Sequence, residues 1–168
     1  IHGIDSLSAG GEVDLLVRKL NHLVAEGLDF DQVVDGITAY QAKTKLLFVL
    51  AKVDNLVKNG RLSKLVGTVV GLLNIRMVGE ASKTGTLELL QKARGQKKAI
   101  KAAFDELLKA GYAGGHITIA HRNNEQFIEQ FSELVRETFA QARIEVLPTS
   151  GLCSFYAEEG GLLMGYAI

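Results

Sequence analysis

Residues 116–148 read HITIAHRNNEQFIEQFSELVRETFAQARIEVLP, and this stretch indicates the fold class. Residues 117–120 and 143–147 are short apolar runs typical of strands, and a helical pattern capped by Asn123 lies between them. The apolar stripe of that helix consists of Phe127, Phe131, Leu134, Val135 and Thr138. A strand, helix, strand order predicts a right-handed crossover and a largely open sheet, so we expect an α/β fold.

Further helices are predicted on the amino-terminal side of this stretch. Apolar side chains recur at helical spacing in residues 13–24, and Gly27 ends the run. Asp29 and Gln32 have the spacing of a capping box, which predicts the start of a second helix. Residues 95–110 predict another amphipathic helix, with apolar side chains on one side and lysines on the other.

Strand-like segments separate these helices. Residues 46–50 predict a buried strand, and residues 75–81 and 86–90 predict a hairpin at the edge of the sheet, joined by the glycine-containing loop 82–85. Residues 1–6 resemble the end of a strand that runs into a loop. Because the chain starts there without methionine, we expect that residues upstream are missing.

Length and charge exclude several classes of protein. The chain has 168 residues, with 19 basic and 19 acidic side chains, so it lacks the excess charge of a general nucleic-acid binder or anionic-membrane binder. Its length suits one domain, or one domain with a remnant of another. The single Cys153 cannot form an internal disulfide, and we find no signal peptide or apolar run that could span a bilayer. We therefore expect a cytoplasmic protein.

Residue types that often bind metals or act in catalysis are present, but their spacing in the sequence does not suit either role. His116 and His121 bracket a strand at odd spacing, which directs them to opposite faces and disfavours a metal site. Cys153 lies in an apolar segment, which favours a small buried residue over a nucleophile. Glu158 and Glu159 are neighbours whose side chains diverge, which suits shared acid–base work poorly. No nucleotide-binding motif is present, so we expect no catalytic residue, no metal and no cofactor.

Two groups of basic side chains and one apolar segment remain. The basic groups are Lys58, Arg61 and Lys64, and Lys92, Arg94, Lys97 and Lys98. They could hold a phosphate or carboxylate, dock an acidic partner, or form a solvated charged face. Residues 65–73 are apolar nearly all round and predict a buried helix, with Gly67 and Gly71 on one face. Either an acyl chain or ordinary helix packing would explain that glycine face.

Several segments, taken in order, resemble one known family. They are Asp5-Ser6-Leu7-Ser8, residues 56–64 (LVKNGRLSK), 71–75 (GLLNI), 92–99 (KARGQKKA) and 151–166. Together they resemble the DegV family of bacterial fatty-acid-binding proteins over essentially the whole chain. The NGR and RGQKKA segments in this order and separation carry the most specific part of the resemblance.

The resemblance implies a two-lobe fold in which a fatty acid lies between the lobes. Residues 1–43 would be a remnant of the amino-terminal lobe with connecting helices, and residues 44–168 the carboxyl-terminal lipid-binding lobe. That lobe would contain a mixed sheet flanked by helices. We expect the full-length protein to be a monomer.

Candidate site residues also follow from the resemblance. Tyr156 aligns where many members carry a histidine, and residues 158–160 align with their Gly-Pro-Gly. A phenol can donate a hydrogen bond but carries no positive charge, so we expect Tyr156 and Ser6 to contact the ligand headgroup. The candidate walls of the acyl tunnel are Phe48, Leu65, Val66, Val69, Val70 and Leu73, each of which could equally be core.

The resemblance finally implies a role and a partner. The protein would bind a long-chain fatty acid and present the carboxylate to the catalytic subunit of a fatty acid kinase, which forms an acyl phosphate. Arg61 and Arg94 would lie on the surface that docks this kinase. Two alternatives stay open: a hydrolase or transferase acting on lipid through Tyr156, Glu158 or Cys153, and an interaction protein indifferent to lipid.

Overall fold

The computed structural model describes residues 1–62 and 74–168. Its helices are α1 (Gly11–Ala25), α2 (Phe30–Gln41), α3 (Asp54–Lys58), α5 (Gln96–Lys109), α6 (Glu125–Thr138) and α7 (Gly151–Ala157). Its strands are β1 (Thr44–Leu50), β2 (Ile75–Ala81), β3 (Leu87–Arg94), β4 (His116–His121), β5 (Arg143–Pro148) and β6 (Leu162–Ala167). The predicted helix 65–73 lies outside the described residues.

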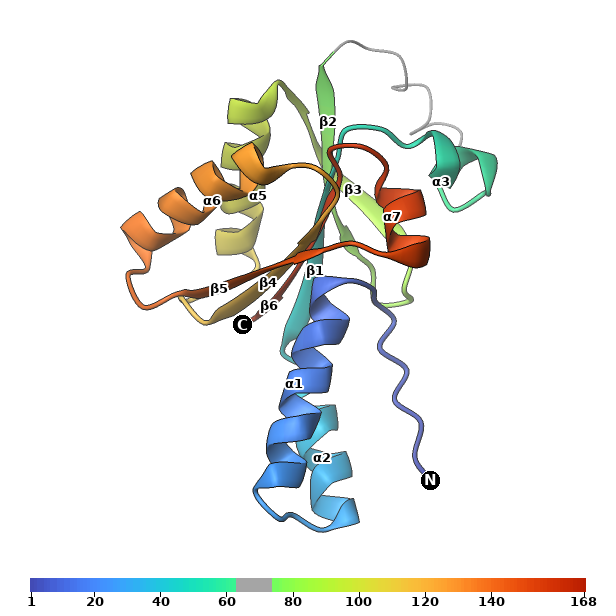
Figure 1. Cartoon of the computed structure of the whole chain (residues 1–168), viewed down its shortest axis with the longest axis vertical. Coiled ribbons are helices and arrows are strands. Elements are labelled where there is room, and N and C mark those ends of the chain that lie inside the picture. Colours follow the sequence, from blue (N-terminus) through green and yellow to red (C-terminus); the bar gives the residue numbers. More distant parts are fainter. Residues whose placement is uncertain (63–73) are drawn as a thin grey trace.

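The described strands form one six-stranded sheet in the order β3-β2-β1-β6-β4-β5 (Figure 1). Strands β4 and β5 are parallel and α6 connects them, whereas every other neighbouring pair is antiparallel. The sheet is therefore mixed, and the α/β fold expected from the sequence is confirmed. The predicted hairpin is also confirmed, because β2 and β3 pair antiparallel at one edge of the sheet.

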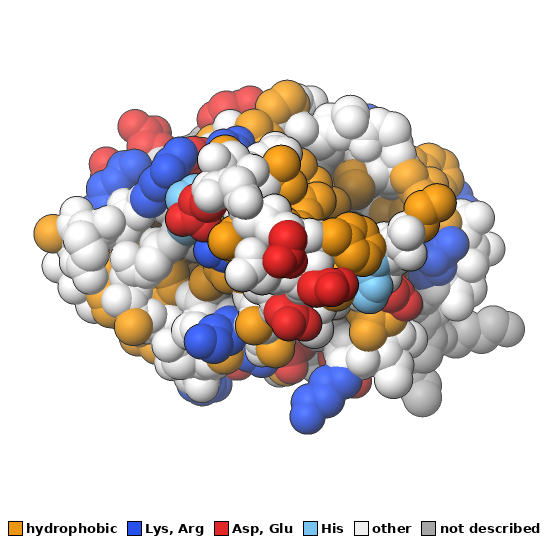
Figure 2. Space-filling view, turned by 90° about the horizontal axis from the view of Figure 1, so that it is seen from below, with side chains coloured by type: hydrophobic (Ala, Val, Ile, Leu, Met, Phe, Trp, Pro, Cys, Tyr) orange, Lys and Arg blue, Asp and Glu red, His pale blue; other side chains and the backbone are white. Residues whose placement is uncertain are grey.

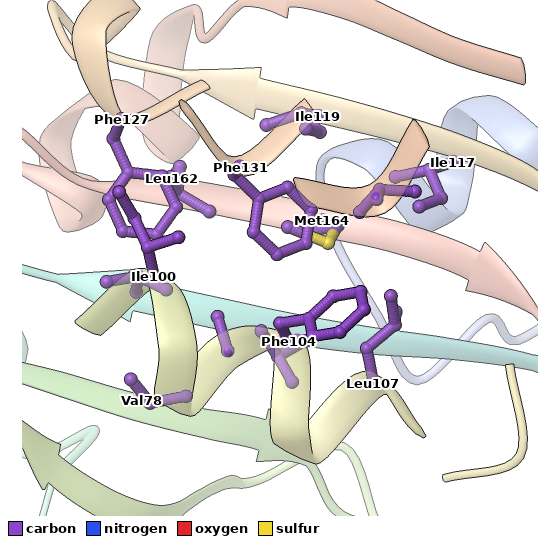
Figure 3. Packing of buried hydrophobic residues seen from close by; sticks show 14 of the residues in the cluster. Val78, Ile100, Phe104, Leu107, Ile117, Ile119, Phe127, Phe131, Leu162 and Met164 are labelled. Atoms are coloured by element: carbon purple, nitrogen blue, oxygen red, sulfur yellow. The ribbon is translucent and has the colours of Figure 1, made fainter. Parts of the chain in front are cut away.

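Helices α5 and α6 cover one face of the sheet and enclose the largest hydrophobic core (Figures 1 and 3). Phe127 and Phe131 of α6 are stacked, with their ring centroids 6.0 Å apart, and both are 0% exposed. Strand residues that alternate along the chain complete this core; they include Leu47, Val49, Ile117, Ile119, Leu162 and Met164. Of the predicted stripe, Phe127, Phe131, Leu134 and Val135 thus lie inward, as the helical period requires, whereas Thr138 in the last turn is exposed.

The opposite face of the sheet carries α1, α3 and α7. Because side chains alternate along a strand, Phe48 and Leu50 of β1 point to this second face and pack with Leu56 of α3 and Ala157 of α7. Helix α1 lies directly on the sheet: a Cβ on Gly165 of β6 would overlap the α1 backbone. This face is thus covered in part by the 15-residue α1 and in part by the short helices α3 and α7.

Three local predictions were wrong. Residues 1–6 form no strand in the structure. The N-cap of α6 is Asn124, not Asn123, and its side chain makes no capping hydrogen bond. Cys153 belongs to a helix, α7, and is only partly buried, because one side of this short helix faces an open groove.

The capping box at the start of α2 is confirmed. The side chain of Asp29 accepts a hydrogen bond from the Gln32 backbone at 2.9 Å, and the Gln32 side chain accepts from the Asp29 backbone at 3.0 Å. Helix α2 packs against α1 through Leu16, Leu23 and Ile37. Within residues 1–62 and 74–168, no helix is long and apolar enough to cross a membrane.

Candidate functional site

A groove of about 690 Å³ opens on the second face of the sheet. Its floor is formed by side chains of β1 and β6, namely Leu46, Phe48, Leu50 and Leu163. Its walls are α7, the end of α3, the β2–β3 turn and residues 5–9. In Figure 2 hydrophobic side chains line a hollow on the side of the molecule where these elements meet. The groove thus combines an apolar floor with a mixed rim.

Phe48 sits in the floor because the strand beside it carries a glycine. Strand β2 has an irregular register between Val78 and Gly79, and Gly79 pairs with Phe48 across the strands. A Cβ on Gly79 would overlap the Phe48 ring. The glycine therefore lets a large aromatic side chain lie close to the sheet, which leaves the space above it for a ligand.

One end of the groove carries a cation and a phenol in contact. Arg61 Nε donates a hydrogen bond to Tyr156 Oη at 2.9 Å, and the guanidinium carbon lies 5.2 Å from the centroid of the Tyr156 ring. Both residues line the groove. Since the phenol oxygen is occupied as an acceptor, its own O–H remains to be donated to a further oxygen.

Residues 5–9 form the opposite wall. Ser6 Oγ is held within this segment, accepting from the Ser8 backbone N–H at 3.3 Å and donating to the Ser8 carbonyl at 3.4 Å. The Ser8 hydroxyl in turn donates to the buried Glu12 of α1. The segment is thereby attached to the first turn of α1, and Ser6 lines the same groove as Tyr156.

The two neighbouring carboxylates at the end of α7 are in different surroundings. Glu158 is 9% exposed, and its Oε1 accepts a hydrogen bond from the Asn55 backbone N–H at 2.9 Å. Glu159 is exposed and accepts from the Asn123 side chain at 3.2 Å. They do not converge on one point, which agrees with the predicted divergence of the two side chains.

Ser6, Phe48 and Tyr156, which were predicted to contact the ligand, line one groove, and so does Arg61, which was predicted to lie on the kinase-docking surface. Arg94 does not line it; this residue is the last of β3, is exposed, and pairs with Ile75 of β2. The remaining tunnel candidates, Leu65, Val66, Val69, Val70 and Leu73, lie outside the described residues. Their roles stay predictions.

Other residues line the groove that were not predicted from the sequence to do so. Leu152 and Cys153 line it from α7, and Leu163 lines it from β6. The spacing of Leu152, Cys153, Tyr156 and Ala157 is helical, and this signal in residues 151–157 could have revealed one face of a short helix. Among the described residues, no three His, Cys, Asp or Glu side chains are grouped in a way that could hold a metal ion.

A family model matches residues 1–167, and its description is an uncharacterised protein of the DegV family. The chain therefore belongs to the DegV family, which confirms the resemblance found from the motifs. The match extends over both the α1–α2 pair and the sheet.

Individual relatives give more detail. The chain is 78% identical over 168 residues to a DegV domain-containing protein of Streptococcus pneumoniae and 74% identical to one of Streptococcus gordonii. Each match includes 100% of this chain and 60% of the relative. The chain therefore spans about 60% of the length of the relatives it matches.

Two solved structures with the same fold are loaded with fatty acids. The Streptococcus pneumoniae fatty acid kinase B3 protein, loaded with linoleic acid, has a TM-score of 0.97 and 78% identity, with 99% of this chain and 59% of that chain covered. A DegV family protein of Eubacterium eligens, loaded with heptadecanoic acid, has a TM-score of 0.94 and 35% identity, covering 98% of this chain and 59% of that one.

Proposed function

We propose that the protein binds a long-chain fatty acid, with the acyl chain in the groove and the carboxylate beside Arg61 and Tyr156. The observation that carries this proposal is the Arg61–Tyr156 pair at the rim of an apolar groove. The fatty acids in related structures support the same ligand class. Because the chain spans about 60% of its relatives, the proposal concerns the full-length protein.

The chemistry of the rim suits an acid. The Arg61 guanidinium supplies a positive charge that a phenol lacks, and the free O–H of Tyr156 can donate to a carboxylate oxygen. Ser6 Oγ lies on the opposite wall as a further hydroxyl. We propose that Arg61 and Tyr156 together do what a charged side chain would do alone, namely bind the anionic headgroup.

The apolar floor supplies most of the binding free energy. Burying a dozen methylenes at about 0.8 kcal/mol each would contribute on the order of 10 kcal/mol. Part of that offsets the loss of translational and rotational freedom of the ligand. Phe48, Leu50 and Leu163 are the described side chains we expect along the acyl chain.

We further propose that the bound carboxylate is presented in the cytoplasm to the catalytic subunit of a fatty acid kinase, which would phosphorylate it. Arg94 is exposed at the end of β3 and carries the positive charge that an acidic docking surface would recognise. This chain would then contribute binding and no catalytic residue. The predicted division at residues 43 and 44, with a monomeric two-lobe protein, belongs to the same proposal.

Native mass spectrometry of the full-length protein, followed by organic extraction, tests the ligand. We expect a fatty acid at one per protein, or its uptake when the protein is incubated with oleate or palmitate. A protein that remains empty under both conditions contradicts the proposal and favours the lipid-independent interaction protein. Release of a modified lipid without any kinase would instead favour the hydrolase or transferase.

The kinase step has its own test. With the purified kinase, Arg94→Glu should reduce acyl-phosphate formation while fatty acid affinity stays unchanged, because Arg94 lies outside the groove. Arg136→Glu is the matched control, since Arg136 is also exposed but lies on α6 across the sheet. Equal activity of both variants would contradict docking through Arg94.

A further inference from the structure

Glu158 has a backbone conformation that side chains avoid. It ends α7 with φ of 53° and ψ of −173°, close to a region that is almost confined to glycine. Its side chain is nevertheless 9% exposed, so a strained residue carries a buried carboxylate. Such a residue persists only where its contacts hold it in place, and those contacts indicate what it does.

The carboxylate of Glu158 caps a helix from another part of the chain. The N-cap position of α3 is Val53, which has no side-chain acceptor to offer. Glu158 Oε1 takes that role by accepting from the Asn55 backbone N–H at 2.9 Å. Asn55 Nδ2 donates in return to the Phe155 carbonyl of α7 at 2.9 Å. Two hydrogen bonds therefore join the end of α7 to the start of α3.

The junction of α7 and α3 lies between Tyr156 and Arg61, the two residues that we propose bind the acid group of the ligand. Tyr156 is on α7, two positions before Glu158. Arg61 follows α3, and its backbone N–H donates to the carbonyl of Leu56 within that helix at 2.9 Å. The positions of the phenol and the guanidinium thus depend on how α7 is held against α3.

We propose that Glu158 is a positioning residue for recognition of the ligand's acid group. It does not line the groove itself; it acts through Tyr156 and Arg61 by fixing α7 against α3. The inference rests on the proposed function and adds a residue to it. It predicts that losing the Glu158 carboxylate weakens binding of an acid but not of a ligand that has the same chain without the charge.

The test compares palmitic acid with hexadecanol on the full-length protein. Glu158→Gly suits the backbone and removes the carboxylate, and it should lower palmitic acid affinity about tenfold while hexadecanol affinity stays unchanged. Glu158→Gln keeps an oxygen acceptor and should retain most of the preference for the acid. Glu159→Gly is the matched control, because its side chain bonds Asn123 and not α3.

A second measurement separates positioning from general stability. Tyr156→Phe should weaken palmitic acid binding less in the Glu158→Gly background than alone, since the phenol is then already misplaced. If Glu158→Gly weakens acid and alcohol equally, or leaves the acid preference intact, the inference is wrong. If the unaltered protein binds no palmitic acid at all, the proposed function itself fails, which is a different result.

Discussion

The two faces of the sheet are built in opposite ways. On one face, two helices of 14 residues each, α5 and α6, cover the strands with continuous apolar stripes. On the other, the 15-residue α1 covers part of the strands, while helices of 5 and 7 residues, α3 and α7, share the rest with residues 5–9 and leave a groove between them. Where a long amphipathic helix lies on the sheet the strands are covered, whereas the short pieces of chain beside α1 leave part of the second face open. The same sheet is thus a scaffold on one side and a candidate binding surface on the other.

The strongest test of this comparison is a truncation in the closed face. Phe131→Ala should lower the free energy of unfolding by about 3 to 5 kcal/mol, because it leaves a cavity among fully buried side chains. Phe155→Ala makes the same change on α7, where the ring is 44% exposed. Urea unfolding should show a loss below about 1 kcal/mol for this control. Similar losses for both variants would contradict the contrast between the faces.

Removing the positive charge of Arg61 at the groove rim should lower the affinity for the ligand and leave the stability of the fold unchanged. Arg61→Leu is expected to reduce fatty acid affinity about tenfold, because it removes a charge-assisted hydrogen bond to the carboxylate. The midpoint of unfolding should stay nearly the same, since Arg61 is exposed. Arg136→Leu on the closed face should alter neither quantity. Unchanged affinity in Arg61→Leu, measured by calorimetry, would exclude it as a headgroup ligand.

Replacing an apolar side chain that lines the groove should have a smaller effect on fatty acid affinity. Leu152 is 65% exposed and lines the groove from α7. Leu152→Asn should lower fatty acid affinity a few-fold, since roughly 1 kcal/mol of apolar contact is lost. Leu108→Asn is the control, because Leu108 is 40% exposed on α5 across the sheet. Equal ligand affinity in both variants would argue against Leu152 as part of the acyl site.

The smallest expected effect concerns pH. Burial lowers the pKa of His116 at the start of β4, and the nearby Glu145 carboxylate opposes that shift only in part. The neutral imidazole is therefore favoured in the folded protein. The neutral His116 should contribute fully to stability above about pH 6.5, the pKa of histidine in the unfolded chain. This contribution should be lost as the pH falls below that value, because the unfolded chain then binds a proton more readily than the folded protein does. Thermal unfolding between pH 7.5 and 5.5 should show a shallower decline for His116→Gln.

Local patterns predicted most of the scaffold. The capping box at Asp29, the edge hairpin and the stripe on α6 depend on neighbouring residues, so a single sequence is enough to find them. Residues 151–157 were harder, because their helical spacing extends over only seven residues and is a weak signal beside the long stripe of α6. The prediction of a strand at residues 1–6 was wrong, because none of the described strands pairs with this segment.

The sequence by itself determined the α/β class and the family, and the family resemblance pointed to three residues that line the groove: Ser6, Phe48 and Tyr156. Only the tertiary structure decided that Arg61 contacts Tyr156 and that Glu158 caps α3. Those pairs are separated by 95 and 103 residues, and such contacts arise when the sheet brings distant segments together. Short-range periodicity fixes which elements form, whereas side-chain partners depend on how those elements pack.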